Sequence, residues 1–203
     1  MRRVIDVLLA IFCLTLFLPL ILMIALLIKF DSPGPVLHLP QMVGQHGKVF
    51  SLFRFRTMAR RVGPLNAEQR LTRLGRLIRN YSLDHLPMLI NLLRGDLTIV
   101  GPRPMELEVV NFENKVWQEY FKVKPGLISY AVLQLGKLWT PTRNTHPNLN
   151  QDLELEYLHN RSASFDMRLI LKTLWALVMS RGNIKARGAA DQDLERQLND
   201  RSH

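Results

Sequence analysis

Asp84 and His85 form an adjacent carboxylate and imidazole pair at the start of an apolar segment. A carboxylate can act as a nucleophile or bind a cation, and a neutral imidazole can act as a base. Ser82 precedes the pair and is a favoured N-cap, while Gly95 ends the segment, so a helix is predicted between them. The helix dipole would keep Asp84 ionised and His85 neutral. Any helix start has the same electrostatics, so the pair alone does not establish a site.

The apolar positions of this segment recur at helical spacing, which supports the predicted helix. They are Leu83, Leu86, Leu89, Ile90 and Leu93. Pro87 falls near the first turn, where its missing N–H does the least damage.

Arginines surround this pair in the sequence. Gly101-Pro102-Arg103-Pro104 predicts a rigid turn that presents one guanidinium, a group that binds phosphate bidentately. A basic stretch also precedes the predicted helix, and two interpretations of it remain open: a solvated face, or a surface for phosphate or lipid head groups. Its members are Arg54, Arg56, Arg60, Arg61, Arg70, Arg73, Arg76 and Arg79.

The composition agrees with an anionic partner. The chain has 203 residues and a formal net charge of +10, which favours nucleic acid, acidic lipid or a phosphorylated substrate. Its single cysteine, Cys13, excludes a disulfide framework and indicates a reducing compartment. A Walker phosphate loop, a Rossmann glycine fingerprint and Cys/His metal spacing do not occur in the sequence.

The segment from Val4 to Ile28 is almost wholly apolar, and it is longer than the about 20 residues that cross a bilayer. A cleaved signal peptide fits poorly, because no small-residue cleavage site follows. Pro19 in its middle predicts a kink, and basic residues lie at both ends, at positions 2, 3 and 29. A kinked helix that re-enters the same leaflet explains both features. A kinked transmembrane helix stays open as the alternative.

The remaining segments predict the elements that would position these groups. Residues 36–39 and 48–55 predict a small hairpin around Gly44 and Gly47. A helix is predicted from Glu106 to Phe121, ended by Lys124-Pro125-Gly126, and residues 138–151 are expected to form a loop.

The last predicted helix runs from about Ser164 to Met179. It would lie either in the membrane interface or in the core. From Asn183 onward the chain is polar and charged, which indicates a loose tail.

Taken together, these motifs resemble the monotopic polyprenyl-phosphate phosphoglycosyl transferases, also called the bacterial sugar transferase family. The resemblance covers residues 1 to about 182. It rests on the following segments in order: the apolar helix broken at Pro19, Ser32-Pro33-Gly34-Pro35-Val36, Gly44, Gly47, Lys48 and Phe50, Arg54-Phe55-Arg56-Thr57-Met58, residues 71–79, Ser82-Leu83-Asp84, Leu86-Pro87, Asn91, Gly95-Asp96, residues 100–104, Val123-Lys124-Pro125-Gly126, Tyr157 and Asp166.

The resemblance implies a fold and a reaction. The fold would be α+β and mostly helical, with a re-entrant helix at 1–30, a transferase domain at 31–182 and a polar tail at 183–203. The carboxylate matched by Asp84 would attack the β-phosphate of a UDP-sugar, release UMP and form an aspartyl-phosphosugar that polyprenol phosphate then takes. Mg²⁺ would bridge Asp84 and the diphosphate.

The resemblance also implies roles for other residues and a location. Arg79 and Arg103, with Arg54 at a family lysine position, would bind phosphate oxygens. Pro102, Pro104 and Glu154 would support the site. The protein would act at the cytoplasmic face of the bacterial inner membrane, among membrane lipids, in exopolysaccharide, capsule, lipopolysaccharide O-antigen or glycoprotein glycan synthesis. A homo-oligomer stays open.

Some positions depart from the family pattern. His85 stands in place of a glutamate, and a neutral imidazole does not supply a second negative charge for magnesium. The other departures are Met88 for glutamine, Arg54 for lysine, Glu154 for aspartate, Leu18 for serine and the missing second glycine in residues 125–131.

Three hypotheses therefore stand beside each other. The first is the enzyme, with Asp84 and His85 as its catalytic pair. The second is a catalytically silent relative that binds polyprenol phosphate or an active partner. The third, a nucleic-acid binder, is not favoured, because no nucleic-acid fold signature occurs and aromatic residues are not interleaved with the arginines.

Overall fold

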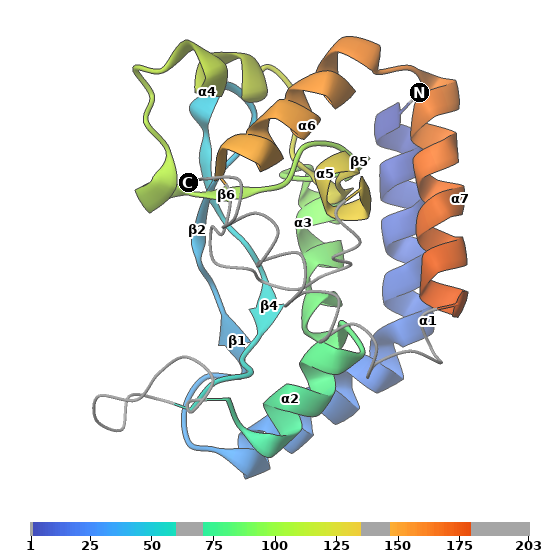
Figure 1. Ribbon diagram of the computed structural model, residues 1–203. Coiled ribbons are helices and arrows are strands. Elements are labelled where there is room, and N and C mark those ends of the chain that lie inside the picture. Colours follow the sequence, from blue (N-terminus) through green and yellow to red (C-terminus); the bar gives the residue numbers. More distant parts are fainter. Residues whose placement is uncertain (1, 60–70, 135–146, 180–203) are drawn as a thin grey trace, which may run out of the picture.

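The N-terminal apolar segment forms one helix, α1 (Arg2–Asp31), in a computed structural model that describes residues 2–59, 71–134 and 147–179. Pro19 lies inside it and lacks the N–H that would bond to the carbonyl oxygen of Thr15. The helix changes direction along its length, as Figure 1 shows. Among the described residues it is the one helix long and apolar enough to cross a membrane, and only 11% of its most apolar window is buried. A core helix of a soluble protein does not fit this exposure.

Four short strands follow α1 and form two antiparallel pairs. They are β1 (Leu37–His38), β2 (Gln41–Val43), β3 (Val49–Ser51) and β4 (Arg54–Phe55). The β2–β3 hairpin turns at Gly44 and Gly47, and β1 pairs with β4 outside it. The predicted hairpin is confirmed, and the outer pair places His38 opposite Arg54.

The segment after the hairpin contains α2 (Arg73–Asn80), a 3₁₀ turn at Leu83–His85 and α3 (Met88–Arg94). The predicted N-cap role of Ser82 is wrong. Ser82 has a φ of 56° and makes no capping hydrogen bond. Pro87 explains the difference, because it cannot donate a backbone hydrogen bond and so separates the 3₁₀ turn from α3. Gly95 ends α3 with a φ of 87°, as predicted.

The helix predicted over residues 106–121 is wrong in its first half. Met105–Glu106 is a strand, β6, which pairs with β2, and Leu107–Val109 is a 3₁₀ turn. The helix α4 covers only Lys115–Tyr120. Asn114 starts it, because its side chain accepts a hydrogen bond from the Val116 N–H at 2.9 Å.

The parallel pair β5 (Thr98–Val100) and β7 (Gly126–Ile128) joins two parts of the chain that are far apart in sequence. The helices α5 (Tyr130–Gln134), α6 (Pro147–Asn160) and α7 (Ala163–Met179) complete the described chain. The loop predicted over 138–151 is wrong from residue 147 onward, where α6 begins with a proline at its first position. The last helix is confirmed within one residue. Residues 138–146, the tail from 183, and Arg60, Arg61 and Arg70 lie outside the described residues.

Both ends of α1 are bound to the rest of the protein. Near its start, the Arg3 guanidinium donates to the carbonyl oxygens of Leu92 and Leu93 at 2.6 Å each, which caps the C-terminal end of α3. Near its end, Ile24 and Ile28 are buried in a cluster that contains Phe55 and Ile78. In Figure 1 the second half of α1 passes beneath α2.

Asp6 adds a buried polar contact between α1 and β5. Its carboxylate accepts hydrogen bonds from the Thr98 hydroxyl at 3.0 Å and from the Ile99 N–H at 3.2 Å, and the residue is 5% exposed. The one acidic residue of the apolar segment is therefore buried against the domain and not exposed with its apolar neighbours.

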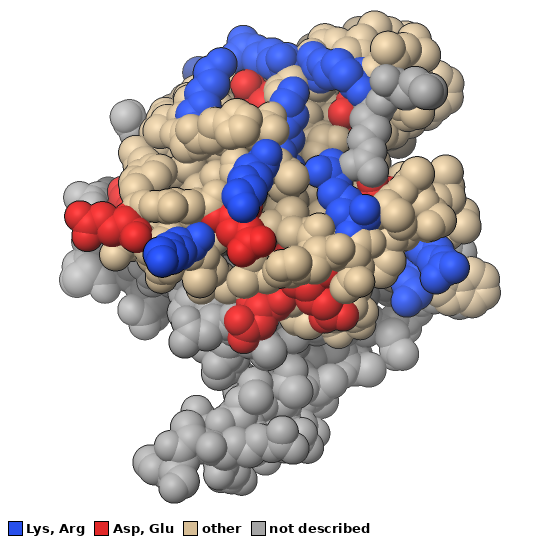
Figure 2. Space-filling view, turned by 90° about the horizontal axis from the view of Figure 1, so that it is seen from above, with Lys and Arg blue, Asp and Glu red and all other residues tan. Residues whose placement is uncertain are grey.

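Surface charge is mixed where Figure 2 looks down on the molecule from above. Lys and Arg side chains lie there in several groups, with Asp and Glu side chains between them. The excess of positive charge does not gather into one patch on that face.

Candidate active site

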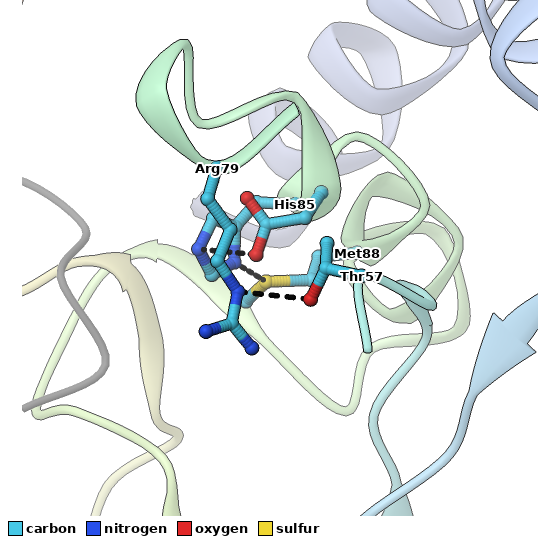
Figure 3. A network of polar contacts seen from close by, with 5 residues as sticks. Thr57, Arg79, His85 and Met88 are labelled. Atoms are coloured by element: carbon cyan, nitrogen blue, oxygen red, sulfur yellow. Dashed lines mark hydrogen bonds and ion pairs between the residues drawn. The ribbon is translucent and has the colours of Figure 1, made fainter. Parts of the chain in front are cut away.

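Asp84 and His85 lie together in the 3₁₀ turn that precedes α3. Both residues are largely buried, with side chains 9% exposed, and His85 Nε2 is 3.4 Å from Asp84 Oδ2. The other ring nitrogen, Nδ1, is 3.1 Å from the sulfur of Met88. Figure 3 shows His85 next to Met88, with Arg79 and Thr57 beside them. Met88 and His85, two of the departures from the family pattern, thus contact each other.

The Asp84 carboxylate is ionised at neutral pH, as predicted. Burial raises its pKa to about 6, and the positive charges of Arg54 and Arg79, with a backbone hydrogen bond, oppose that rise. Asp84 lies in the 3₁₀ turn that directly precedes α3. With a pKa of about 6, roughly nine tenths of the carboxyl groups are ionised at pH 7.

His85 is neutral at pH 7, as predicted. Burial lowers its pKa well below the usual value, and the charges of Arg54, Arg103 and Arg79 lower it further. All three arginines therefore lie close enough to act on the same imidazole. The pair therefore combines an anionic carboxylate with a neutral ring inside a cationic environment.

Arg79 is held at the site by its contact with Thr57. Its Nε donates to the Thr57 hydroxyl at 2.8 Å, which leaves the two terminal nitrogens of the guanidinium for other acceptors. Gly75 allows this contact, because α2 packs its backbone directly on Thr57. A Cβ at position 75 would lie 1.9 Å from the Thr57 carbonyl oxygen.

Arg54 comes to the site from β4. Its Nε is buried without a hydrogen-bond partner among the described residues. Burial lowers the pKa of the guanidinium, and the charge of Asp84 opposes that shift. A buried guanidinium nitrogen without a protein partner favours an anionic ligand, because leaving a buried donor unpaired is unfavourable.

Arg103 lies in the turn between β5 and β6. Pro102, which is buried, accepts a hydrogen bond from the Gly126 N–H at 2.8 Å, so the turn is fixed to β7. Glu154 supports the same turn from α6, since its Oε1 accepts from the Arg103 N–H at 3.1 Å. Burial raises the pKa of Glu154 to about 7.

Most of the predicted site residues meet in this region. Asp84, His85, Arg54, Arg79 and Arg103 interact electrostatically, and Pro102 and Glu154 contact the arginine turn. Pro104 is half-buried after that turn. Pro19 belongs to α1, and its role as the membrane break stays a prediction.

Some contributors were missed by sequence reasoning. Thr57 and Tyr120 bind Arg79 and Arg103, respectively, and Ser129 binds Glu154. His38 was missed too, although burial and the nearby charge of Arg54 lower its pKa. Thr57 lies in a segment that carries the family resemblance, which was the one signal available for it, whereas Ser129 lies in residues 125–131, which depart from the family pattern.

The donor atoms of the site limit how it could hold a metal ion. In residues 2–59, 71–134 and 147–179, no group of three or more His, Cys, Asp or Glu side chains converges as a metal cage would. Magnesium prefers oxygen ligands and is often held by one or two carboxylates together with substrate phosphates. Asp84 therefore fits magnesium only where phosphate oxygens complete the coordination.

A profile described as bacterial sugar transferase matches residues 1–180. The chain belongs to the bacterial sugar transferase family. A similar relative is the UDP-glucose:undecaprenyl-phosphate glucose-1-phosphate transferase of Caulobacter vibrioides, which is 34% identical over 188 residues, 87% of this chain and 69% of that protein. The uncharacterized sugar transferase EpsL of Bacillus subtilis is 32% identical over 186 residues, 90% of this chain and 89% of that protein.

Other bacterial sugar transferases are longer than the part that this chain matches. The UDP-N-acetylgalactosamine-undecaprenyl-phosphate N-acetylgalactosaminephosphotransferase of Aeromonas hydrophila is 31% identical over 190 residues, but those residues are 44% of that protein. The chain thus spans about two thirds of the Caulobacter relative and less than half of the Aeromonas one.

Proposed function

We propose that this bacterial sugar transferase moves a sugar-1-phosphate from a UDP-sugar to polyprenol phosphate and so starts the synthesis of a bacterial glycan such as an exopolysaccharide. The names of the relatives support the class of donor and acceptor. The observation that carries the proposal is the Asp84 carboxylate, which is buried, ionised at neutral pH and flanked by the charges of Arg54 and Arg79. Such a group can attack phosphorus, while the arginines bind the phosphate oxygens.

The first step forms a bond between Asp84 and the donor. An Asp84 oxygen attacks the β-phosphorus of the UDP-sugar, the bond from that phosphorus to the bridging oxygen breaks, and UMP leaves with the electron pair. The sugar phosphate is then an acyl phosphate on Asp84. Arg79 and Arg103 offset the negative charge on the phosphate oxygens, and Arg54 keeps the carboxylate ionised.

The second step releases the sugar phosphate from Asp84 and regenerates its free carboxylate. A phosphate oxygen of the polyprenol phosphate attacks the same phosphorus, the bond to Asp84 breaks, and a polyprenyl diphosphate sugar forms. The incoming phosphate attacks as its dianion, and His85, which is neutral and 3.4 Å from Asp84, adds no negative charge to repel it.

A divalent cation belongs to the proposal. Asp84 would be its protein ligand, with diphosphate oxygens as the others, and the cation would add positive charge to the diphosphate. We expect the release of UMP to need Mg²⁺ and to stop in a chelator.

The location is proposed from α1. Its first turn binds α3 and β5 through Arg3 and Asp6, and its second half packs on Phe55 and Ile78. Two ends held by one domain lie on the same side of a membrane, which supports re-entry over a full span. The basic residues at both ends support the cytoplasmic face of the inner membrane.

The experiment is a panel of UDP-sugars read out as UMP release from the purified protein, with undecaprenyl phosphate as the acceptor. We expect one sugar at least to give turnover, and Asp84→Asn to abolish it. Asp152→Asn, which removes an exposed carboxylate from α6, is the matched control and should keep the activity. Intact-protein mass spectrometry should find a sugar-phosphate adduct on wild type incubated with donor alone. Full turnover in Asp84→Asn would refute the mechanism.

A second candidate is a silent relative that binds polyprenol phosphate or an active partner. The neutral His85 favours it, because the negative charge that a glutamate would bring next to Asp84 is missing. His85→Glu separates the two. A large gain in UMP release over wild type would support a silenced site, whereas a loss would make His85 a working part of the enzyme.

A further inference from the structure

The turn that carries Arg103 lies directly on β7. The Gly126 N–H donates to the Pro102 carbonyl oxygen at 2.8 Å, and the Gly101 N–H donates to the Ile128 carbonyl oxygen at 3.0 Å. The two glycines touch, since a Cβ at Gly126 would lie 2.1 Å from the Gly101 nitrogen. The start of the turn is thus fixed by backbone contacts that no side chain could replace.

Both peptide groups of Arg103 itself are bound by buried side chains. Its N–H donates to Glu154 Oε1 at 3.1 Å, and its carbonyl oxygen accepts from the Tyr120 hydroxyl at 2.7 Å. Glu154 is 1% exposed and Tyr120 is 3% exposed. They come from α6 and α4, which lie at the same end of the molecule in Figure 1. One residue is therefore held on both sides by two separate helices.

The Glu154 carboxylate is an unfavourable group to bury for stability alone. Its Oε1 accepts from the Ser129 hydroxyl as well as from Arg103, while its Oε2 is buried without a partner among the described residues. An apolar side chain of similar size would avoid this desolvation. The Glu154 carboxylate provides a hydrogen-bond acceptor for the Arg103 N–H, which an apolar side chain could not provide.

Tyr120 is fixed by its neighbours in the same way. Its ring packs edge-on against Trp117 and Phe121, with centroids 5.4 Å away in each case. Burial raises the pKa of its hydroxyl well above the usual value, so it stays a hydrogen-bond donor. The hydroxyl therefore has one position and one acceptor.

The positive charge of the Arg103 side chain acts on His85 and on Arg54. That charge contributes to the low pKa of His85. We propose that Tyr120 and Glu154 are positioning residues, which hold the backbone of Arg103 so that its guanidinium stays directed at the diphosphate of the donor. The proposal rests on the proposed function, because it takes the ligand to be a nucleoside diphosphate.

The test measures the affinity of the purified full-length protein for UDP by calorimetry. One lost hydrogen bond to the Arg103 backbone should weaken UDP binding about fivefold, in Tyr120→Phe and in Glu154→Ala alike. Glu154→Gln should bind nearly as wild type, because its amide oxygen can still accept from the N–H. Tyr130→Phe, which removes a hydroxyl bonded to Glu156, is the matched control and should not change the affinity.

A double-mutant cycle with Arg103→Ala distinguishes positioning from general stability. Without the guanidinium, Tyr120→Phe and Glu154→Ala should weaken UDP binding no further. Equal losses with and without Arg103 would overturn the proposal, and so would unchanged affinity in Tyr120→Phe. Should Glu154→Ala not fold, Tyr120→Phe carries the test.

The cycle also distinguishes a failure of the positioning proposal from a failure of the proposed function. If Arg103→Ala binds UDP as wild type does, the phosphate contact of Arg103 in the proposed function fails, and positioning fails with it. If Arg103→Ala weakens binding and Tyr120→Phe does not, positioning alone is wrong.

Discussion

At the scale of single residues, two buried carboxylates lie near the site and meet different surroundings. Asp84 faces the charges of Arg54 and Arg79, which keep its pKa at about 6 despite burial. Glu154 accepts hydrogen bonds from a hydroxyl and a backbone N–H, and its pKa rises to about 7. Burial is the largest cause for both carboxyl groups, and Glu154, at 1% exposed against 7% for Asp84, is the more deeply buried, so its pKa rises further although Arg103 lowers it.

Glu154 should make the stability of the protein depend on pH. Its pKa is about 7 in the folded chain and close to 4.5 when unfolded, so its stabilising contribution is complete below pH 4.5 and is lost as the pH rises through 7. The loss amounts to about 3 kcal/mol at most. Glu154→Gln does not titrate, so we expect its Tm to change less than that of wild type between pH 5 and pH 8.

The control for this comparison is Asp152→Asn, an exposed carboxylate on the same helix. Its Tm should follow wild type across the pH range. Parallel curves for wild type and Glu154→Gln would contradict the assignment of this titration to Glu154.

At the scale of elements, α2 is placed by the backbone contact of Gly75 with Thr57. Thr72 starts the helix, since its hydroxyl accepts from the Gly75 N–H at 2.8 Å. The same Thr57 binds Arg79 through its hydroxyl. One residue of the segment after β4 thus determines both where α2 lies and where its arginine is held.

Gly75→Ala should move α2 and disturb the site. The added methyl would meet the Thr57 carbonyl at 1.9 Å, and such overpacking costs about 1–3 kcal/mol, roughly 2–10 °C in Tm. The shift should also weaken UDP binding through Arg79. Arg76→Ala, an exposed change on the same helix, should leave both Tm and UDP affinity near wild type. An unchanged Tm in Gly75→Ala would contradict the close packing.

The elements that periodicity and turn residues predict are those whose cause is local. The hairpin at Gly44 and Gly47, the end of α3 at Gly95 and the helix α7 follow from nearby residues, and the structure confirms them. The strand β6 could not be predicted in this way, because its pairing with β2 joins distant segments. α6 was missed because its polar residues look like a loop, although it carries Glu154.

The residues of the site also divide into those that the sequence predicts and those that depend on long-range contacts. Asp84 and Arg103 were singled out from residue type and turn chemistry, and the family pattern then implied roles for them and for Arg79. The contacts that hold the arginines join residues 17 to 51 positions apart, such as Arg103 with Tyr120 and with Glu154, so spacing in the sequence does not predict them. Burial and the charges of Arg54 and Arg79 act on the pKa of Asp84, and spacing in the sequence does not predict these effects.

At the scale of the whole molecule, α1 presents apolar side chains outward over its entire length while polar groups at its start bind the domain. The exposed large side chains include Leu8, Phe12, Leu16, Leu22, Leu26 and Phe30. Arg3 and Asp6 bond to α3 and β5 on the inner side. The helix is thus a shared element, with one exposed apolar face and one face packed on the protein.

A cysteine at residue 2 should report the topology of α1. We expect Arg2→Cys, in a Cys13→Ala background, to be labelled by a membrane-impermeant maleimide only from the cytoplasmic side of sealed vesicles. Asp152→Cys on the exposed surface of α6 gives the reference for that side. Labelling of Arg2→Cys from the opposite side to Asp152→Cys would establish a full span.

The contacts on the inner face of α1 limit how this protein could be prepared without detergent. Deleting residues 1–31 would strip Ile24 and Ile28 from Phe55 and Ile78, and would leave the Ile99 N–H without its acceptor. The truncated polypeptide would expose the apolar surface that α1 had covered, and it would aggregate. Water solubility is better sought by replacing the outward apolar side chains of the helix with polar ones, while every inward residue is kept.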